Sequence, residues 1–150
     1  MDKIDRKILD HIQRKGRDSY AKIGESVGLS VSAINDRIKR LVATGAIRHW
    51  SAVVDPAIAG RTLLAYVSVQ LERPEHDKGF VAAVAGLGAV QECHHVTGDW
   101  SYLLKIRVAD TAALERLIVD WIKTLPGVVR TQTVIALSST KETHVLQCSA

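Results

Sequence analysis

The chain has 150 residues, enough for one ordinary domain or two small ones, and 47% of them are hydrophobic while 24% are charged. This composition is typical of a globular protein, and no apolar run is long enough to cross a bilayer or to act as an export signal. Cys93 and Cys148 are too few to suggest a disulfide framework, so we expect a reduced, cytoplasmic protein without a membrane partner.

The basic excess lies entirely in the first part of the chain. Residues 1–60 hold 11 Lys and Arg against 7 Asp and Glu, a net charge of +4, whereas residues 61–150 hold 9 against 9. A basic first domain beside a neutral second one is typical of nucleic-acid binding, although solvated helix faces produce such an excess as well.

Three short helices are predicted in residues 1–60. Apolar residues recur in each at helical spacing, and glycines follow the expected ends of the helices at positions 16, 28 and 45. Ser19 and Ser30 are expected to cap the second and third helices. The residues expected to face inward are Ile4, Ile8, Leu9 and Ile12 in the first helix, Tyr20, Ile23 and Val27 in the second, and Ile34, Ile38, Leu41 and Val42 in the third.

The corner between the second and third helices is very tight. Only Gly28 and Leu29 precede the capping Ser30, and such a corner is typical of a helix-turn-helix unit, whose second helix enters the major groove of DNA. On the third helix, small and polar residues come first and cations follow, which suits a close approach to DNA. The alternative is an ordinary three-helix core with a solvated basic face.

After Gly45, the segment Ile47–Val54 is predicted to be a strand that serves as a wing or as a connector, with Arg48 placed to touch phosphate. Together with the outward face and flanks of the third helix, this segment completes the predicted DNA-binding surface. Its residues are Ser30, Ser32, Ala33, Asn35, Asp36, Arg37, Lys39, Arg40 and Arg48.

The second part of the chain is predicted to alternate between strands and helices in the order β-α-β-β-α-β. This order indicates a ferredoxin-like sheet with helices on one face, so we expect an α+β protein with a winged helix-turn-helix domain in residues 1–60 and a ferredoxin-like domain in residues 61–150. The other sheet face is apolar enough to need a partner, and a symmetric dimer would cover it. The predicted strands are Leu64–Leu71, Val90–Thr97, Trp100–Val108 and Val128–Leu137, with a possible fifth at Thr143–Cys148; the helices lie around Phe80–Leu87 and Leu114–Leu125.

Catalysis is the main alternative class of function. Cys93 and His95 share one face of a strand while His94 points to the other, and no second cluster of residues completes a zinc site. The sequence also lacks a glycine-rich phosphate loop and a paired-carboxylate motif. We therefore expect a protein that is not an enzyme and that needs no cofactor or metal.

Four segments then carry a resemblance that covers nearly the whole chain. VGLS, RIKRLVATGAI, ECHHVTGDWSYLLK and LPGV follow one another at compatible spacing between IDRKIL near the start and THVL near the end. In these segments the chain resembles the Lrp/AsnC family of transcription regulators. The resemblance implies binding to double-stranded DNA, homodimers formed through the C-terminal sheets, further assembly into tetramers or octamers, and a small effector, commonly an amino acid, held between neighbouring dimers.

The resemblance also implies where the effector binds. Backbone N–H groups around Gly98 can bind the carboxylate of an amino acid, and Asp99 can bind its ammonium. Trp100 or Tyr102 can pack against an apolar side chain of the effector. A plain hairpin turn would explain the same residues. Members that respond to amino acids commonly carry an acidic residue where this chain has Ser101, and the family often has a basic one in place of Asp36. The implied effector-binding residues are Val96, Thr97, Gly98, Asp99, Trp100, Ser101 and Tyr102, with Thr131, Thr133 and Ile135 as the neighbouring wall.

Two further interpretations share this architecture. Some tetrapyrrole-processing decarboxylases have a similar pair of domains, and His94 and His95 keep that interpretation open, whereas Lys39, Arg40 and the intact VGLS turn argue for DNA binding. The other interpretation is an amino-acid-sensing assembly module that does not bind DNA.

Overall fold

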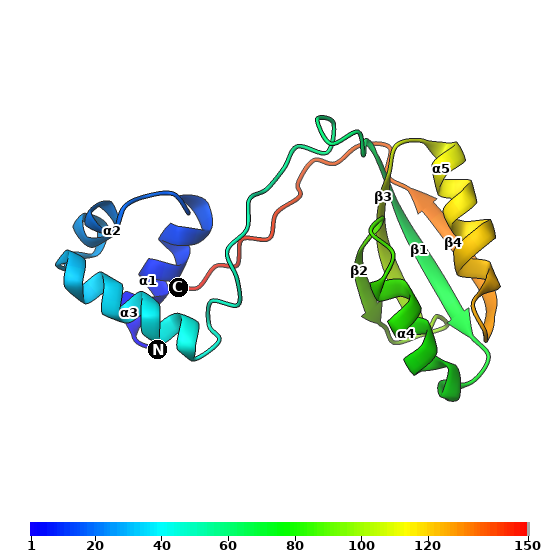
Figure 1. Cartoon of the computed structure of the whole chain (residues 1–150), viewed down its shortest axis with the longest axis horizontal. Helices are drawn as coiled ribbons and strands as arrows, with labels where there is room; N and C mark the ends of the chain where they lie inside the picture. Colours follow the sequence, from blue (N-terminus) through cyan, green and yellow to red (C-terminus); the bar gives the residue numbers. More distant parts are fainter. Residues whose placement is uncertain (150) are drawn as a thin grey trace. The chain divides into compact units, whose positions relative to one another are not determined.

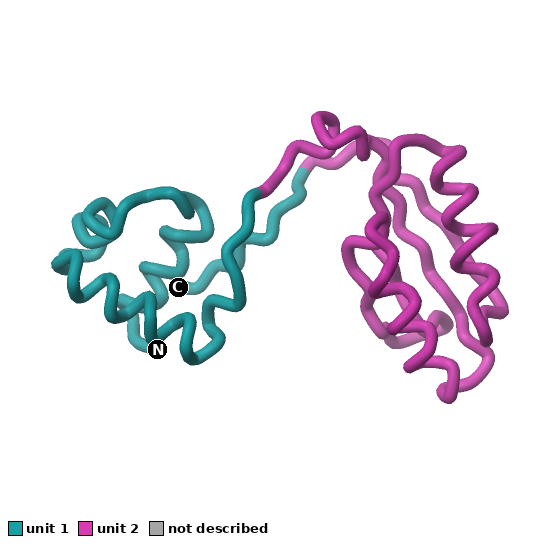
Figure 2. The backbone as a smooth tube through the Cα atoms, in the orientation of Figure 1, with its two compact units in different colours: residues 1–52, 141–150 teal, residues 53–140 magenta. Residues whose placement is uncertain are grey.

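A computed structural model describes residues 1–149 and divides the chain into two compact units (Figure 2). The first unit contains residues 1–52 together with the C-terminal segment that begins at Lys141, and the second contains Val53–Thr140. None of the helices in the described residues is long and apolar enough to cross a membrane. The architecture is mixed α and β, with three helices followed by a four-stranded sheet and its helices (Figure 1).

The three predicted helices of the first unit are confirmed as α1 (Lys3–Arg14), α2 (Tyr20–Val27) and α3 (Val31–Ala43). The predicted caps are also confirmed, because the side chain of Ser19 accepts from the backbone N–H of Lys22, and that of Ser30 accepts from the backbone N–H of Ala33. The buried core of the unit consists of Ile8, Leu9, Ile12, Ile23, Ile34, Ile38, Leu41 and Ile47.

Two residues predicted to face inward are instead exposed. Tyr20 is the first residue of α2 and lies outside the core, and Val42 follows Leu41 by about 100° around α3 and so turns away from it. The apolar stripe on each helix is therefore narrower than the pattern of apolar residues indicates.

The corner between α2 and α3 depends on two glycines. Gly28 ends α2 in the left-handed region, with a φ of 73°, and the backbone N–H of Leu29 returns to the carbonyl of Gly24 at 3.0 Å. A Cβ atom at Gly24 would lie 2.4 Å from the carbonyl oxygen of Leu29, so the turn occupies the space that a side chain would need. This close approach sets the start of α3 and confirms the predicted helix-turn-helix.

The predicted strand at Ile47–Val54 is wrong. Ile47 is buried and its N–H donates to the carbonyl of Leu41, but within residues 1–149 no strand forms between α3 and Leu63, and so this segment makes no wing. The apolar and β-branched residues of this segment favour an extended chain, but a strand also needs a neighbouring backbone with which to pair. Here the segment is a connector.

The predicted fifth strand at Thr143–Cys148 is also wrong, because this segment binds helix α1 rather than the sheet. The amide side chain of Gln13 accepts from the backbone N–H of Leu146 at 2.8 Å and donates to its carbonyl at 2.9 Å. Asp10 accepts from the backbone N–H groups of Cys148 and Ser149 and from the Ser149 hydroxyl. Cys148 packs against the buried core of the first unit.

The second unit has the predicted β-α-β-β-α-β order. Its strands are β1 (Leu63–Leu71), β2 (Val90–His95), β3 (Tyr102–Val108) and β4 (Val128–Ile135). Its helices are α4 (Asp77–Ala85), which follows the short helical turn η1 (Pro74–His76), and α5 (Thr111–Arg116), which continues as helical turns η2 (Leu117–Trp121) and η3 (Ile122–Thr124). The strand order is β2-β3-β1-β4 and every neighbouring pair is antiparallel, which is the ferredoxin-like arrangement.

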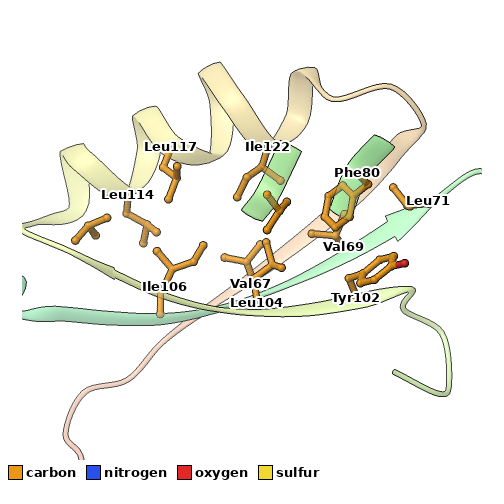
Figure 3. Packing of buried hydrophobic residues seen from close by; sticks show 13 residues of the cluster. Val67, Val69, Leu71, Phe80, Tyr102, Leu104, Ile106, Leu114, Leu117 and Ile122 are labelled. Atoms are coloured by element: carbon orange, nitrogen blue, oxygen red, sulfur yellow. The ribbon is translucent and has the colours of Figure 1, made fainter. Parts of the chain in front are cut away.

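One face of the sheet is covered by the helices. Alternate residues of β1 and β3, such as Val67 and Leu104, point toward Leu114, Leu117 and Ile122 of the second helical segment (Figure 3). Phe80 of α4 completes this core beside Tyr102, whose ring centroid lies 4.9 Å away.

The opposite face of the sheet is open within one chain. Tyr66 at its centre pairs in register with Lys105 of β3 and with Val134 of β4, and both Tyr66 and Val134 are exposed. Lys105 is buried and its ammonium lies 3.2 Å from the carboxylate of Glu92. The open face therefore combines exposed apolar groups with an ion pair whose lysine is buried and whose glutamate is partly exposed.

Candidate functional site

The outer face of α3 presents the predicted base-reading residues to solvent. Ser32, Asp36 and Lys39 are exposed, and neither Asp36 nor Lys39 forms an ion pair with any residue from 1 to 149. Ala33 and Asn35 are half-buried on the flanks of the same surface. Asp36 pairs with neither Lys39 nor Arg40, which leaves a carboxylate on the surface proposed to face DNA.

Two of the predicted phosphate ligands are instead held by the N-terminus of α1. One guanidinium nitrogen of Arg37 lies 2.7 Å from an oxygen of Asp2 and 2.7 Å from an oxygen of Asp5, and Arg40 reaches Asp5 at 3.0 Å. The side chain of Arg37 is only 22% exposed, while that of Arg40 is 57% exposed. Arg40 therefore keeps donors free for another acceptor, whereas Arg37 joins α1 to α3.

The carboxylates that hold these arginines are part of a capping box. The backbone N–H of Asp5 donates to Asp2 and the backbone N–H of Asp2 donates to Asp5, at 2.8 and 3.1 Å. Burial raises the pKa of Asp5, but the hydrogen bonds from the Asp2 N–H and from Arg37 outweigh it and leave the pKa lowered. The pKa of Asp2 is lowered to about 2, first by the N–H of Asp5 and then by Arg37. Both carboxylates are thus charged at neutral pH.

The remaining predicted DNA-binding residues lie at the two ends of α3. Ser30 uses its hydroxyl oxygen to cap the helix, so its contribution at this position is to fix the start of α3. Arg48 is exposed in the connector beyond the helix and forms no ion pair with any residue of the described chain. Sequence analysis did not identify the partners Asp2 and Asp5, although the spacing Asp-x-x-Asp at the start of a helix is a signal for a capping box.

The predicted effector loop is a tight connection between β2 and β3. The backbone N–H of Val96 donates to the carbonyl of Ser101, and Gly98 takes a φ of 100°. Ser101 is tied to β1, because its N–H donates to the carbonyl of Val69 at 2.9 Å and its hydroxyl oxygen accepts from the N–H of Leu71 at 3.0 Å. Thr97, Gly98 and Asp99 are exposed at the tip.

The two aromatic residues of the loop have different surroundings. Tyr102 is 5% exposed, and its ring stacks on that of His95 at 5.0 Å. Burial raises the pKa of Tyr102, and the neighbouring carboxylate of Asp77 adds to the effect. Trp100 is half-buried, and the guanidinium of Arg130 lies over one face of its ring at 4.2 Å in a cation–π contact.

The predicted neighbouring wall lies on β4, whose Arg130 covers the ring of Trp100 in the loop at 4.2 Å. Thr131, Thr133 and Ile135 pair in register with Val69, Val67 and Ala65, so they share the helix-covered side of the sheet.

A small hollow adjoins the loop on the side of α4. Its volume is about 140 Å³. The sequence offered no signal for this hollow, because its walls come from the end of β1, the start of α4, the end of β2 and the loop. The lining residues are Leu71, Glu72, Arg73, Pro74, Asp77, His95 and Ser101.

The histidines that suggested catalysis are separated as the strand pattern predicts. His94 pairs with Glu92 at 3.0 Å on the open face of the sheet, and His95 stacks on Tyr102 on the other side. In the part of the chain that the structure describes, no three His, Cys, Asp or Glu side chains are grouped to hold a metal ion. Cys93 is partly shielded from water, and this burial raises the pKa of its thiol.

Comparisons with known proteins match both units. The AsnC-type helix-turn-helix domain matches residues 1–42, and the Lrp/AsnC ligand binding domain matches residues 64–146. The leucine-responsive regulatory protein of Salmonella typhimurium is 38% identical over 148 residues, which are 97% of this chain and 90% of that protein.

Solved structures match over nearly the full chain. A transcriptional regulator of Neisseria meningitidis, solved as a complex with L-Met, is 30% identical with a TM-score of 0.93, covering 97% of this chain and 96% of the other. The feast or famine regulatory protein of M. tuberculosis, complexed with L-methionine, is 32% identical with a TM-score of 0.87, covering 97% and 99% of the two chains.

Proposed function

This chain belongs to the Lrp/AsnC family of transcription regulators, and on that premise we propose which residues of its two units bind DNA and an amino acid. The protein is a DNA-binding transcription regulator whose action is modulated by an amino acid. We assign DNA binding to residues 1–60 and effector binding and assembly to residues 61–150, and we place the protein in the cytoplasm. The C-terminal segment from Lys141 adds to the DNA-binding unit by packing on α1.

The observation that carries the assignment to DNA is the exposed outer face of α3 in a helix-turn-helix. Its first turns bear Ser32, Ala33 and Asn35, which are small enough to let the helix approach base edges in the major groove. Lys39 lies further along the helix as a cation without an ion pair among the described residues, suited to a phosphate. Asp36 faces the same way and can accept a hydrogen bond from a cytosine amino group.

The arginines divide into two roles in this proposal. Arg40 and Arg48 contact phosphates, since both keep exposed guanidinium groups. Arg37 is a positioning residue, because its guanidinium is already bound by Asp2 and Asp5 and fixes α3 against the N-terminus of α1. Ser30 likewise positions α3 through its cap.

The amino acid is proposed to bind at the loop between β2 and β3. Gly98 and Asp99 are exposed there, and the half-buried Trp100 offers an aromatic ring for an apolar side chain. The two relatives solved with methionine support an amino acid as the class of effector. We propose that a second dimer supplies Thr131, Thr133 and Ile135 as the facing wall.

Assembly follows from the open face of the sheet. A homodimer that packs two such faces together would cover Tyr66 and Val134 and present two α3 helices to half-sites about one turn of DNA apart. Tetramers or octamers of these dimers would create the effector clefts. The effector then acts by binding one arrangement of the DNA-binding units more tightly than another.

The DNA assignment is tested with the full-length protein and a mixed-sequence duplex. Fluorescence anisotropy gives the affinity over a range of salt concentrations, and the slope of log K against log salt reports the number of phosphate contacts. Lys39→Ala should reduce this slope by about one unit per subunit bound. Lys78→Ala, which removes an exposed cation of α4, is the matched control and should leave the slope unchanged. Equal slopes for Lys39→Ala and the wild type would remove Lys39 from the interface.

A further inference from the structure

The chain passes twice between its two units (Figure 2). The first connection, residues 48–62, leads from the end of the helix-turn-helix to β1. The second connection, residues 137–145, leads from Ala136, which is hydrogen-bonded to β1, to Leu146, which is hydrogen-bonded to α1. Neither of these two described stretches forms a helix or a strand, so each is a plain length of chain that joins the units.

The end of the second connection is held by side chains of α1 that bind its backbone. Gln13 accepts from the N–H of Leu146 at 2.8 Å and donates to its carbonyl at 2.9 Å. Asp10, three positions earlier on the same face of the helix, accepts from the N–H groups of Cys148 and Ser149 at 2.8 and 2.9 Å. Hydrogen bonds to a carboxylate are stronger than those between neutral groups. Helix α1 thus carries a binding site for a peptide backbone, and the C-terminal segment of the chain fills it.

Cys148 makes this attachment a defined point. Its N–H is bound by Asp10, and its carbonyl accepts from the guanidinium of Arg6 at 3.4 Å. Its side chain packs against the buried core of the first unit, with Sγ 3.5 Å from Nε2 of Gln13. One residue is therefore held through its backbone N–H, its backbone carbonyl and its side chain.

The two connections reach the first unit on different helices. The first continues from α3, and the second ends on α1. Fully extended, residues 137–145 span roughly 30 Å, whereas residues 48–62 could span roughly 50 Å. The second connection is thus the shorter of the two. A single attachment limits how far a body can move, and a second attachment at another point also limits how far it can turn.

We propose that residues 137–149 act as a second tether that restricts the separation of the two DNA half-sites that one dimer can bind. The inference rests on the proposed binding of two half-sites by a dimer. A shift of one half-site by one base pair turns it by roughly 35° about the axis of the duplex. A DNA-binding unit on one flexible connection can follow this turn, whereas a unit that is also held at α1 follows it less. The two units then bind together only where the separation fits, because the effective concentration for the second half-site falls at other separations.

The test lengthens the tether without changing its contacts. The segment Gly-Ser-Gly-Ser-Gly-Ser is inserted between Thr140 and Lys141 of the full-length protein, which adds up to about 20 Å of reach and leaves the hydrogen bonds of Asp10 and Gln13 in place. The same segment added at the C-terminal end of the chain is the matched control, because it lies beyond the attachment to α1. Each protein selects sites from a pool of random-sequence duplexes that span several helical turns. Sequencing of the selected duplexes gives the distribution of half-site separations.

We expect the wild type and the C-terminal control to select one separation within about one base pair, and the insertion variant to select neighbouring separations over roughly three base pairs or more. Equal breadth in the insertion variant and the wild type overturns the tether. Selection of single half-sites by the wild type overturns the proposed binding of two half-sites itself.

A second pair of variants separates the tether from the stability of the helices. The double substitution Asp10→Ala and Gln13→Ala releases the segment from α1 and should broaden the distribution as the insertion does. Lys7→Ala, at an exposed cation of α1, is its control and should keep the wild-type distribution. Hydrogen exchange in α1 of the insertion variant should match the wild type, because the contacts remain. Broadening in the double variant without broadening in the insertion variant would assign the effect to the stability of α1 and overturn the tether.

Discussion

Replacing Asp5 with asparagine should loosen the whole DNA-binding unit. The carboxylate of Asp5 is 1% exposed and accepts from the N–H of Asp2, from Arg37 and from Arg40 at 2.7 to 3.1 Å. Asn keeps the shape of the side chain but removes its charge and replaces one acceptor oxygen with a donor. That donor would face a guanidinium group or the N–H of Asp2.

The loss of stability depends on whether Arg37 and Arg40 find other partners once the Asp5 carboxylate is removed. Removing one partner of a fully buried ion pair costs about 3–5 kcal/mol. Arg40 is already 57% exposed and can turn to water, and Arg37 keeps its contact with Asp2, so we expect a loss of about 2–3 kcal/mol. A unit of this small size has only several kcal/mol of stability, and the loss is therefore a large share of it.

Hydrogen exchange of the full-length protein measures this loss locally. A loss of about 2 kcal/mol corresponds to exchange faster by roughly 30-fold, which is expected for the protected amides of α1 and α3. Amides of β1 and β3 in the same sample serve as the internal reference and should not change. Asp36→Asn, at an exposed carboxylate of α3, is the control variant and should stay within about 0.5 kcal/mol of the wild type. Exchange in Asp5→Asn within threefold of the wild type would refute the role given to this carboxylate.

Three other perturbations test the same unit and its attachments. Because the pKa of Asp2 falls from 3.8 to about 2 on folding, its contribution to stability is complete above pH 3.8 and is lost as the pH falls toward 2. Acid unfolding of the wild type, followed by circular dichroism, should show this loss of stability. The Asp2→Asn variant should lack this pH-dependent contribution. Gly24→Ala should destabilise the helix-turn-helix by about 1–3 kcal/mol in urea unfolding, since its Cβ would lie 2.4 Å from a backbone oxygen. As a control, the Cβ of Gly79→Ala in α4 meets no atom, and this variant should stabilise the second unit by roughly 0.5–1 kcal/mol. Deleting the chain from Lys141 onward should speed hydrogen exchange in α1, because Asp10 and Gln13 lose their backbone partners, and unchanged exchange there would show that the segment does not stabilise the unit.

The helix-turn-helix was predictable from local signals. Ser19 and Ser30 cap their helices as expected, and Gly28 takes the left-handed conformation that ends α2. These features depend on residues a few positions apart, and for that reason a sequence indicates them directly. The order of strands in the second unit was predictable for a related reason, since few topologies connect this series of elements.

The two wrong strands show where local signals end. Ile47–Val54 and Thr143–Cys148 contain several apolar residues that suit a strand, but a strand requires a partner backbone, and the sequence does not say which one. The C-terminal segment instead meets Asp10 and Gln13, more than 130 positions earlier in the chain.

The roles of individual site residues depend on similar distant contacts. Arg37 looked like a phosphate ligand because it lies on the flank of α3, yet its partners Asp2 and Asp5 lie more than 30 positions away. The hollow at Asp77 and Ser101 was hidden for the same reason, because it forms only when α4 and the loop between β2 and β3 meet at the end of β1. Charge and spacing in the sequence identified the DNA-binding surface, whereas the tertiary contacts determine which of its residues are free to bind DNA and which position α3.

The central claim is that an amino acid bound to the second unit changes the affinity of the first unit for DNA. Its most direct test is duplex binding by the full-length protein with and without a saturating amino acid, chosen as the one that gives the largest thermal shift. We expect the duplex affinity to change by about fivefold or more, and the duplex to change the affinity for the amino acid by the same factor, because coupling between two sites is reciprocal. Equal duplex affinity in the two states would contradict the claim.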